Sequence, residues 1–132
     1  MNIVVDTSVI IAVIANEPVK SSLVALTNDA TLIAPLSLHW EIGNAFSAMF
    51  KRNLITLEEA ERAVFLYEQI PIAFKDVSLL ESLQLAHELG IYAYDAFMLS
   101  CGMRYKAPLL TLDSGLKIAA ETKGIVCLEA KK

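Results

Sequence analysis

The chain has 132 residues and a formal charge of −4, with 11 basic side chains against 15 acidic ones. This length suits one domain with its own hydrophobic core, and an apolar fraction of 55% excludes an intrinsically disordered chain. The acidic balance argues against a protein that binds nucleic acid through a broadly basic surface. We therefore expect one domain over residues 1–132.

The cysteines and apolar runs indicate a cytoplasmic protein without a membrane partner. Cys101 and Cys127 are far apart and have none of the spacings of zinc sites or redox pairs. Asp6 interrupts the first apolar run, so no signal-peptide pattern forms. The longest uninterrupted apolar stretch, residues 9–15, is far shorter than the roughly 18 to 20 residues that span a bilayer.

Short apolar strands alternate with helices along the chain. The β-branched run at residues 3–5 ends at Asp6-Thr7-Ser8, a typical helix start, and Thr56 with Glu59 has the form of a capping box. We expect strands at 3–5, 31–34, 72–74, 109–112 and 125–128, and helices at 9–15, after Pro18 up to Asn28, 36–52, 56–69, 78–90, 94–104 and 114–122. This alternation predicts an α/β fold with a mostly parallel, helix-covered sheet.

Four acidic residues stand where chemistry is expected. Asp6 and Asp113 each follow a predicted strand, and ligands of parallel sheets bind beyond the carboxyl ends of the strands. Asp95 begins a predicted helix in apolar surroundings, where a lone carboxylate is costly. Glu41 lies between Trp40 and Ile42, with Asn44 on the same helix face one turn on.

Simpler roles for these residues stay open at this point. Each aspartate could do no more than cap the helix it precedes, and Glu41 could be a solvated residue of an amphipathic helix. The neighbouring hydroxyl side chains, Thr7, Ser8 and Thr111, could bond only to nearby backbone. Composition and periodicity do not show that the four acids converge.

The order of these motifs resembles the PIN-domain family, and within it the VapC-type ribonuclease toxins of toxin–antitoxin pairs. The resemblance covers nearly the whole chain. It rests on Asp6-Thr7-Ser8 after the first strand, Glu41 on a helix about 35 residues later, Tyr94-Asp95-Ala96, and Thr111-Leu112-Asp113. It implies a three-layer α/β/α sandwich with a central, mostly parallel sheet.

The resemblance also implies an activity and a cofactor. Asp6, Glu41, Asp95 and Asp113 match the catalytic and metal-binding acids of the family, which hold Mg²⁺ or Mn²⁺ and cut RNA. Ser8 and Thr111 match accessory polar positions, and Asn44 is the third accessory residue that we expect. The expected reaction is hydrolysis of a phosphodiester bond by a metal-activated water, which leaves 5′-phosphate and 3′-hydroxyl ends.

The expected partners are an RNA substrate, a cognate antitoxin protein and a second copy of the chain. The antitoxin would cover apolar surface near Trp40 and Phe46 or on the helices that start near Val9 and Val19. An arginine of its extended tail would lie among the acids.

Candidate RNA contacts come from the basic residues at the ends of the two acid-bearing helices, which could equally be solvated helix ends. They are Lys51, Arg52, Arg104 and Lys106. Tyr92 and Tyr94 could stack on bases or pack at the core rim. His39 is interpreted as a packing residue. Ser114 follows Asp113 where many relatives carry a charged residue, which weakens the expectation of a phosphate contact there.

Two other functions compete with the nuclease. A catalytically silent PIN-like module that binds a partner protein would keep the fold, and metal binding would distinguish it. A phosphoryl-transfer regulator of receiver type needs paired acids after the first strand, and only Asp6 stands there.

The nuclease hypothesis also accounts for the net charge of the chain. Of the 15 acidic residues, four belong to the proposed metal site, and the other 11 equal the number of basic residues. The net negative charge is therefore that of the metal site.

Overall fold

The computed structural model describes residues 1–131, and its strands form one parallel sheet in the order β3-β2-β1-β4-β5. The strands are β1 (Asn2–Val5), β2 (Thr31–Pro35), β3 (Ile72–Lys75), β4 (Leu109–Leu110) and β5 (Cys127–Leu128). The helices are α1 (Thr7–Ile14), α2 (Lys20–Thr27), α3 (Ser37–Lys51), α4 (Leu57–Glu68), α5 (Leu79–Leu89), α6 (Ala93–Tyr105) and α7 (Ser114–Thr122).

The sheet brings the ends of distant segments to one edge. In the central strand β1, Val4 pairs with Ile33 of β2 on one side and with Leu109 of β4 on the other. All four strand pairs are parallel, so the chain leaves every strand at the same edge. The residues that follow β1 and β4 therefore lie next to each other, although more than 100 positions separate them in the chain.

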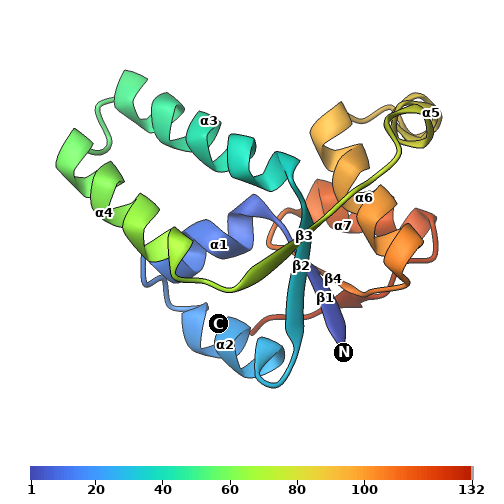
Figure 1. Cartoon of the computed structure of the whole chain (residues 1–132), viewed down its shortest axis with the longest axis horizontal. Helices are drawn as coiled ribbons and strands as arrows, with labels where there is room; N and C mark the ends of the chain where they lie inside the picture. The colour runs from blue at the N-terminus through green and yellow to red at the C-terminus, as the bar shows by residue number, and fades with distance from the viewer. Residues whose placement is uncertain (132) are drawn as a thin grey trace.

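Helices cover both faces of this sheet and confirm the predicted α/β/α layers. Figure 1 shows α1, α2 and α4 on one side of the strands and α5, α6 and α7 on the other. The interior strand residues are completely buried, including Ile3, Val4, Ile33 and Leu110. In residues 1–131 no helix is both long enough and apolar enough to cross a bilayer.

Most predicted element boundaries are confirmed where a cap defines them. Thr56 and Glu59 form the predicted capping box at the start of α4. Ser78 caps α5, which ends at Gly90 with a φ of 65°, a backbone conformation that glycine adopts without strain. Helix α7 has the predicted bounds, because Asp113 caps it.

Two helix starts differ from prediction. Helix α1 begins at Thr7 rather than Val9, because Asp6 already accepts the capping bond from the backbone of Val9. Asp95 does not begin α6: the helix starts at Ala93, and Tyr92 is its N-cap residue.

The last two strands are shorter than predicted. β4 ends at Leu110, because the next backbone amides bond to side chains instead of to the sheet: Leu112 donates to Ser8 Oγ and Asp113 to Thr111 Oγ1. β5 contains only Cys127 and Leu128.

The apolar residues of α2 and α3 differ in how far they are buried. Leu23 of α2 is buried and Leu26 is partly buried, but Val24 is exposed. On α3, Phe46 is buried, whereas Trp40 is 61% exposed and Phe50 also reaches solvent. Apolar periodicity identified the helix, but packing leaves Trp40 on the surface.

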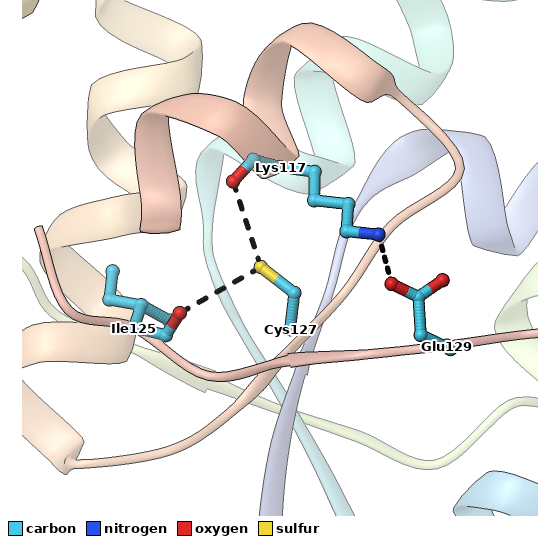
Figure 2. A network of polar contacts seen from close by, with 4 residues as sticks. All are labelled: Lys117, Ile125, Cys127 and Glu129. Atoms are coloured by element: carbon cyan, nitrogen blue, oxygen red, sulfur yellow. Dashed lines mark hydrogen bonds and ion pairs between the residues drawn. The ribbon is translucent and has the colours of Figure 1, made fainter. Parts of the chain in front are cut away.

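Residues 127–131 contact α7 first and then α2. Figure 2 shows the ion pair between Lys117 of α7 and Glu129, with the Cys127 thiol beside the carbonyls of Lys117 and Ile125. Further on, the backbone of Lys131 donates to Ser22 Oγ at 2.8 Å.

Both cysteines are free thiols, and burial raises the pKa of Cys101 to about 11, which keeps it protonated.

Candidate active site

Asp6 is the most buried carboxylate at the carboxyl edge of the sheet, with 6% of its surface exposed. Its Oδ1 accepts hydrogen bonds from Ser8 Oγ at 2.6 Å and from the backbone of Val9 at 3.2 Å. Its Oδ2 accepts from Thr111 Oγ1 at 2.5 Å. These donors fix both carboxylate oxygens and compensate for their removal from water.

The two accessory hydroxyls join the β1–α1 turn to the β4–α7 turn. Ser8 Oγ accepts from the backbone of Leu112 at 3.0 Å, and Thr111 Oγ1 accepts from the backbone of Asp113 at 3.0 Å. Ser8 Oγ therefore bonds to Asp6 in its own turn and to Leu112 in the opposite turn, and Thr111 Oγ1 bonds to Asp113 in its own turn and to Asp6 in the opposite turn. This hydrogen-bond network places Asp113 beside Asp6.

The other three acids reach the same region from separate helices. Asp113 precedes α7, and its Oδ1 accepts from the backbone of Leu116 at 3.1 Å. Asp95 lies in the first turn of α6 and is partly buried. Glu41 lies in the second turn of α3, where Ser37 Oγ donates to its Oε2 at 3.5 Å.

The pKa shifts of the acids indicate that they lie close to one another. Burial, with smaller effects from the charges of Asp6 and Asp95, raises the pKa of Glu41 to about 7. Burial also raises the pKa of Asp95, with smaller effects from Asp113 and Asp6. For Asp6, burial again dominates, hydrogen bonds oppose it, and Asp113 adds to it. Mutual repulsion among the four carboxylates shows that the structure brings them together.

The alternative that each aspartate caps a helix is confirmed for two of the three aspartates. Asp6 caps α1 and Asp113 caps α7, so both have a structural role. Asp95 caps nothing, because the N-cap position of α6 belongs to Tyr92 and has no side-chain hydrogen bond. Glu41 is partly buried rather than fully solvated. Asp95 and Glu41 therefore carry a desolvation cost without a capping role to account for it.

The donor set suits a hard divalent cation, which takes oxygen ligands. Thr7, next to Asp6, has a buried hydroxyl with no hydrogen-bond partner among residues 1–131. Within the same residues, no three acidic, histidine or cysteine side chains are gathered closely enough to form a ready-made metal site. Bringing the carboxylates closer needs a cation, because like charges otherwise keep them apart.

Three of the four predicted RNA contacts lie away from this edge. Lys51 and Arg52 are exposed at the far end of α3, and Lys106 follows the far end of α6. At 1.5 Å of rise per residue, roughly 15 Å of helix separates them from the acids on the same helices. Arg104 donates to the carbonyl of Asp76 at 3.0 Å.

Residues near Glu41 divide into site and packing roles. Ser37 was not among the predicted site residues, although its position four residues before Glu41 places both on one helix face. Asn44, predicted as accessory, is exposed one turn after Glu41. His39 is a packing residue, as predicted: its ring contacts Trp40, and its Nδ1 lies 3.2 Å from the Tyr67 hydroxyl.

A parallel α/β/α sandwich with carboxylates gathered at the carboxyl ends of β1 and β4 defines the class of protein. A family model described as PIN domain matches residues 3–121. The chain therefore belongs to the PIN-domain family.

Solved structures share this fold at low sequence identity. PAE2754 from Pyrobaculum aerophilum has a TM-score of 0.69 and 21% identity, over 96% of this chain and 92% of that one. VapBC2 from Rickettsia felis, bound to a DNA fragment from their promoter, has a TM-score of 0.72 and 16% identity, over 99% and 100%. FitAcB from Neisseria gonorrhoeae has a TM-score of 0.57 and 19% identity, over 96% of each chain. No curated protein matches the chain.

Proposed function

We propose that this protein is a metal-dependent endoribonuclease of the VapC type, the toxin of a toxin–antitoxin pair. The observation that carries the proposal is the set of four carboxylates at one sheet edge, each of which is close enough to repel at least one of the others. Membership of the PIN-domain family supports a nuclease, and the structural likeness to VapBC2 supports the VapC type.

Asp6, Glu41, Asp95 and Asp113 are the residues that would hold Mg²⁺ or Mn²⁺. When bound, such an ion lowers the pKa of water for attack at neutral pH and offsets charge on the reacting phosphate. The remaining contributions come from the protein. Ser8 and Thr111 hold the Asp6 oxygens in place, and their bonds to the opposite turn keep Asp113 beside them.

The substrate in this proposal is RNA, and its backbone contacts remain the four predicted basic residues. Three of them, Lys51, Arg52 and Lys106, are far from the acids, so phosphate charge near the cut would be neutralised chiefly by the bound cation. RNA binding should then depend on the metal.

The proposed antitoxin partner fits an apolar groove of about 250 Å³ between α1, α3 and α4. Ile11 and Ile14 line it from α1, and Phe46 and Met49 from α3. Arg62 and Glu59 of α4 give it a charged border. The groove includes Phe46 and the helix near Val9, two of the surfaces expected for the antitoxin.

A homodimer is the second proposed assembly. Leu80 and Leu83 of α5 are exposed leucines that a second copy could cover. We expect size-exclusion chromatography to give twice the monomer mass at high protein concentration. A monomer under those conditions would remove the dimer from the proposal.

The nuclease assignment is tested with purified protein, Mg²⁺ or Mn²⁺ and an RNA pool. We expect Asp6→Asn and Asp95→Asn to lower the cleavage rate by at least about 100-fold, because a catalytic metal contributes several kcal/mol of charge stabilisation. Glu61→Gln on the exposed face of α4 is the matched control and should cut like the wild type. Equal cleavage by wild type and both aspartate variants would contradict the assignment.

A catalytically silent interaction module is the competing proposal. It would keep the same fold and the same four acids without holding a metal. Calorimetry with Mn²⁺ separates the two proposals. The nuclease requires binding that Asp95→Asn weakens, whereas the silent module predicts no such binding.

A further inference from the structure

A second groove, which we call the aromatic groove, opens at the same edge of the sheet as the acids. Its volume is about 350 Å³, and its walls come from the start of α3, the end of β3 and the first turns of α6. Trp40, Tyr94 and Phe97 supply its rings, and Ser37 and Lys75 are among its polar residues. Trp40 is 61% exposed and Tyr94 is 44% exposed, so both rings are available to a ligand.

The rings of the aromatic groove are held by their neighbours. The Trp40 ring meets the His39 ring edge-on, with 5.0 Å between centroids, and His39 in turn contacts the Tyr67 hydroxyl. The rings of Tyr94 and Phe97 meet at 6.2 Å with a steep interplanar angle of 67°. A ligand that stacks here therefore meets surfaces that are already oriented, which lowers the entropic cost of binding.

The aromatic groove adjoins the acidic site at Ser37. Ser37 lines the groove and also donates to the carboxylate of Glu41. Tyr94 lines the groove and directly precedes Asp95. A ligand in the groove is therefore one side chain away from the carboxylate of Glu41.

Cations lie near the end of the groove formed by β3. Lys75 Nζ lies 5.5 Å from the centre of the Tyr105 ring, and the guanidinium carbon of Arg104 lies 5.4 Å from the same centre. Arg104 and the Tyr105 hydroxyl both donate to the carbonyl of Asp76, which also lines the groove. Two positive charges are thus gathered around one aromatic ring.

We propose that the aromatic groove binds an unpaired RNA base adjacent to the phosphate that is cut, with the next phosphate toward Lys75. This inference rests on the proposed nuclease function. Each part of the site matches one part of a single-stranded RNA. The acids with their divalent ion match the phosphate that is cut, the rings match the base, and Lys75 matches the next phosphate. Stacking on protein rings tolerates any base, so the groove favours unpaired RNA over a particular sequence.

Electrostatics favours RNA over a second copy of the chain as the occupant. A second copy seated on this groove would bring its own four carboxylates toward the first four, and like charges repel. An RNA phosphate instead meets Lys75 and, at the other end, a metal-loaded acidic site.

The test uses the intrinsic fluorescence of Trp40, which is the only tryptophan of the chain. The full-length protein is titrated with a six-nucleotide single-stranded RNA and with a ribose-phosphate hexamer that lacks bases. Ca²⁺ replaces Mg²⁺, because it has the same charge but a less exacting coordination geometry, and a gel checks that the RNA stays intact. We expect quenching by the RNA and none by the abasic hexamer.

Variants then identify the contacts, with affinity read from the anisotropy of a labelled RNA. Tyr94→Leu and Trp40→Ala should each weaken RNA binding about tenfold and leave abasic binding unchanged. Lys75→Ala should weaken both ligands equally, because it contacts phosphate. Phe65→Ala removes an aromatic ring that is 60% exposed on α4, outside the groove, and is the matched control. Circular dichroism confirms folding of each variant.

Equal quenching by the two hexamers would overturn the inference. So would a dimer that Trp40→Ala converts to a monomer without loss of RNA affinity, because a second copy would then occupy the groove. Cleavage keeps the two proposals distinguishable. If Asp6→Asn abolishes cleavage while Trp40→Ala leaves RNA affinity intact, the nuclease stands and the aromatic groove fails. If Asp6→Asn cuts normally while base-dependent quenching persists, the nuclease proposal fails instead.

Discussion

At the residue scale, Asp6 combines a structural and a chemical role. It caps α1 through Val9, and its two oxygens are held by Ser8 and Thr111. Hydrogen bonds to the charged form lower the pKa of its carboxyl, but burial raises it by more. The result is a carboxylate with fixed geometry in surroundings that favour a counter-ion.

Glu41 gives the metal-free protein a pH-dependent stability. Its pKa is about 7 in the folded protein, against 4.5 ordinarily, so the folded state holds the proton more tightly than the unfolded state between those values. The free energy of unfolding should therefore fall as pH rises from about 4.5 through 7. For this partly exposed carboxyl we expect a loss of about 1 kcal/mol after allowance for solvent screening.

Urea unfolding in EDTA at pH 5 and pH 8 measures this effect. Glu41→Gln cannot ionise, so its stability should change less between the two pH values than that of the wild type. Glu61→Gln, on the exposed face of α4, should behave like the wild type. If Glu41→Gln retains the full pH dependence, the stability change has another source.

At the element scale, the site is built from strand ends that pass directly into helices. β1 leads through Asp6 into α1, and β4 leads through Thr111 and Asp113 into α7. In each unit an aspartate caps the helix that follows. The short strand β4 is part of this design, because Thr111 bonds to Asp6 rather than continuing the sheet.

The two roles of Asp113 can be separated by two substitutions. Asparagine caps a helix about as well as aspartate, whereas alanine cannot, so Asp113→Ala should lower the free energy of unfolding by about 1 kcal/mol and Asp113→Asn should change it little. Both should weaken Mn²⁺ binding, because both remove a negative charge. Urea unfolding and Mn²⁺ calorimetry measure the two effects. If Asp113→Asn binds Mn²⁺ as tightly as the wild type does, Asp113 has no metal-binding role and acts only as a helix cap.

At the scale of the whole molecule, the charge of −4 is unevenly distributed. Four acids meet at one sheet edge, and three of the four basic residues expected to contact RNA, Lys51, Arg52 and Lys106, lie at the far ends of helices. Among residues 1–131, these three basic residues are too far from the acids to attract RNA to the acidic site by long-range charge. Binding should instead depend on filling the acidic site with a cation.

A salt titration of RNA binding tests this dependence. We expect affinity to rise when Mn²⁺ is added, and log K to fall with log salt at a slope no steeper than about −3. Four basic contacts to a single strand correspond to about that value, at roughly 0.7 for each phosphate neutralised. The measurement is fluorescence anisotropy of a labelled RNA with Ca²⁺ or Mn²⁺ and with EDTA. A steep slope without any divalent ion would show a basic surface elsewhere.

Local patterns predicted much of the fold. Helices with strong caps, such as α4 with Thr56 and Glu59, were predicted with nearly their observed bounds, because a cap is decided by residues three positions apart. The end of β4 was not predicted, because it depends on distant neighbours: the strand was expected to run to Leu112 and ends at Leu110.

For the candidate site, the sequence by itself determined which residues carry charge and at which strand and helix ends they stand. It named all four acids and the hydroxyls of Ser8 and Thr111, through their order along the chain. Only the tertiary structure decided that these residues meet, because their proximity depends on the parallel pairing of β1 with β4 across more than 100 positions. It also decided that Trp40 and Tyr94 line a groove beside the acids, since that depends on how α3, β3 and α6 pack together. Local chemistry is set by neighbours in the chain, whereas a site on a parallel sheet is set by strand order.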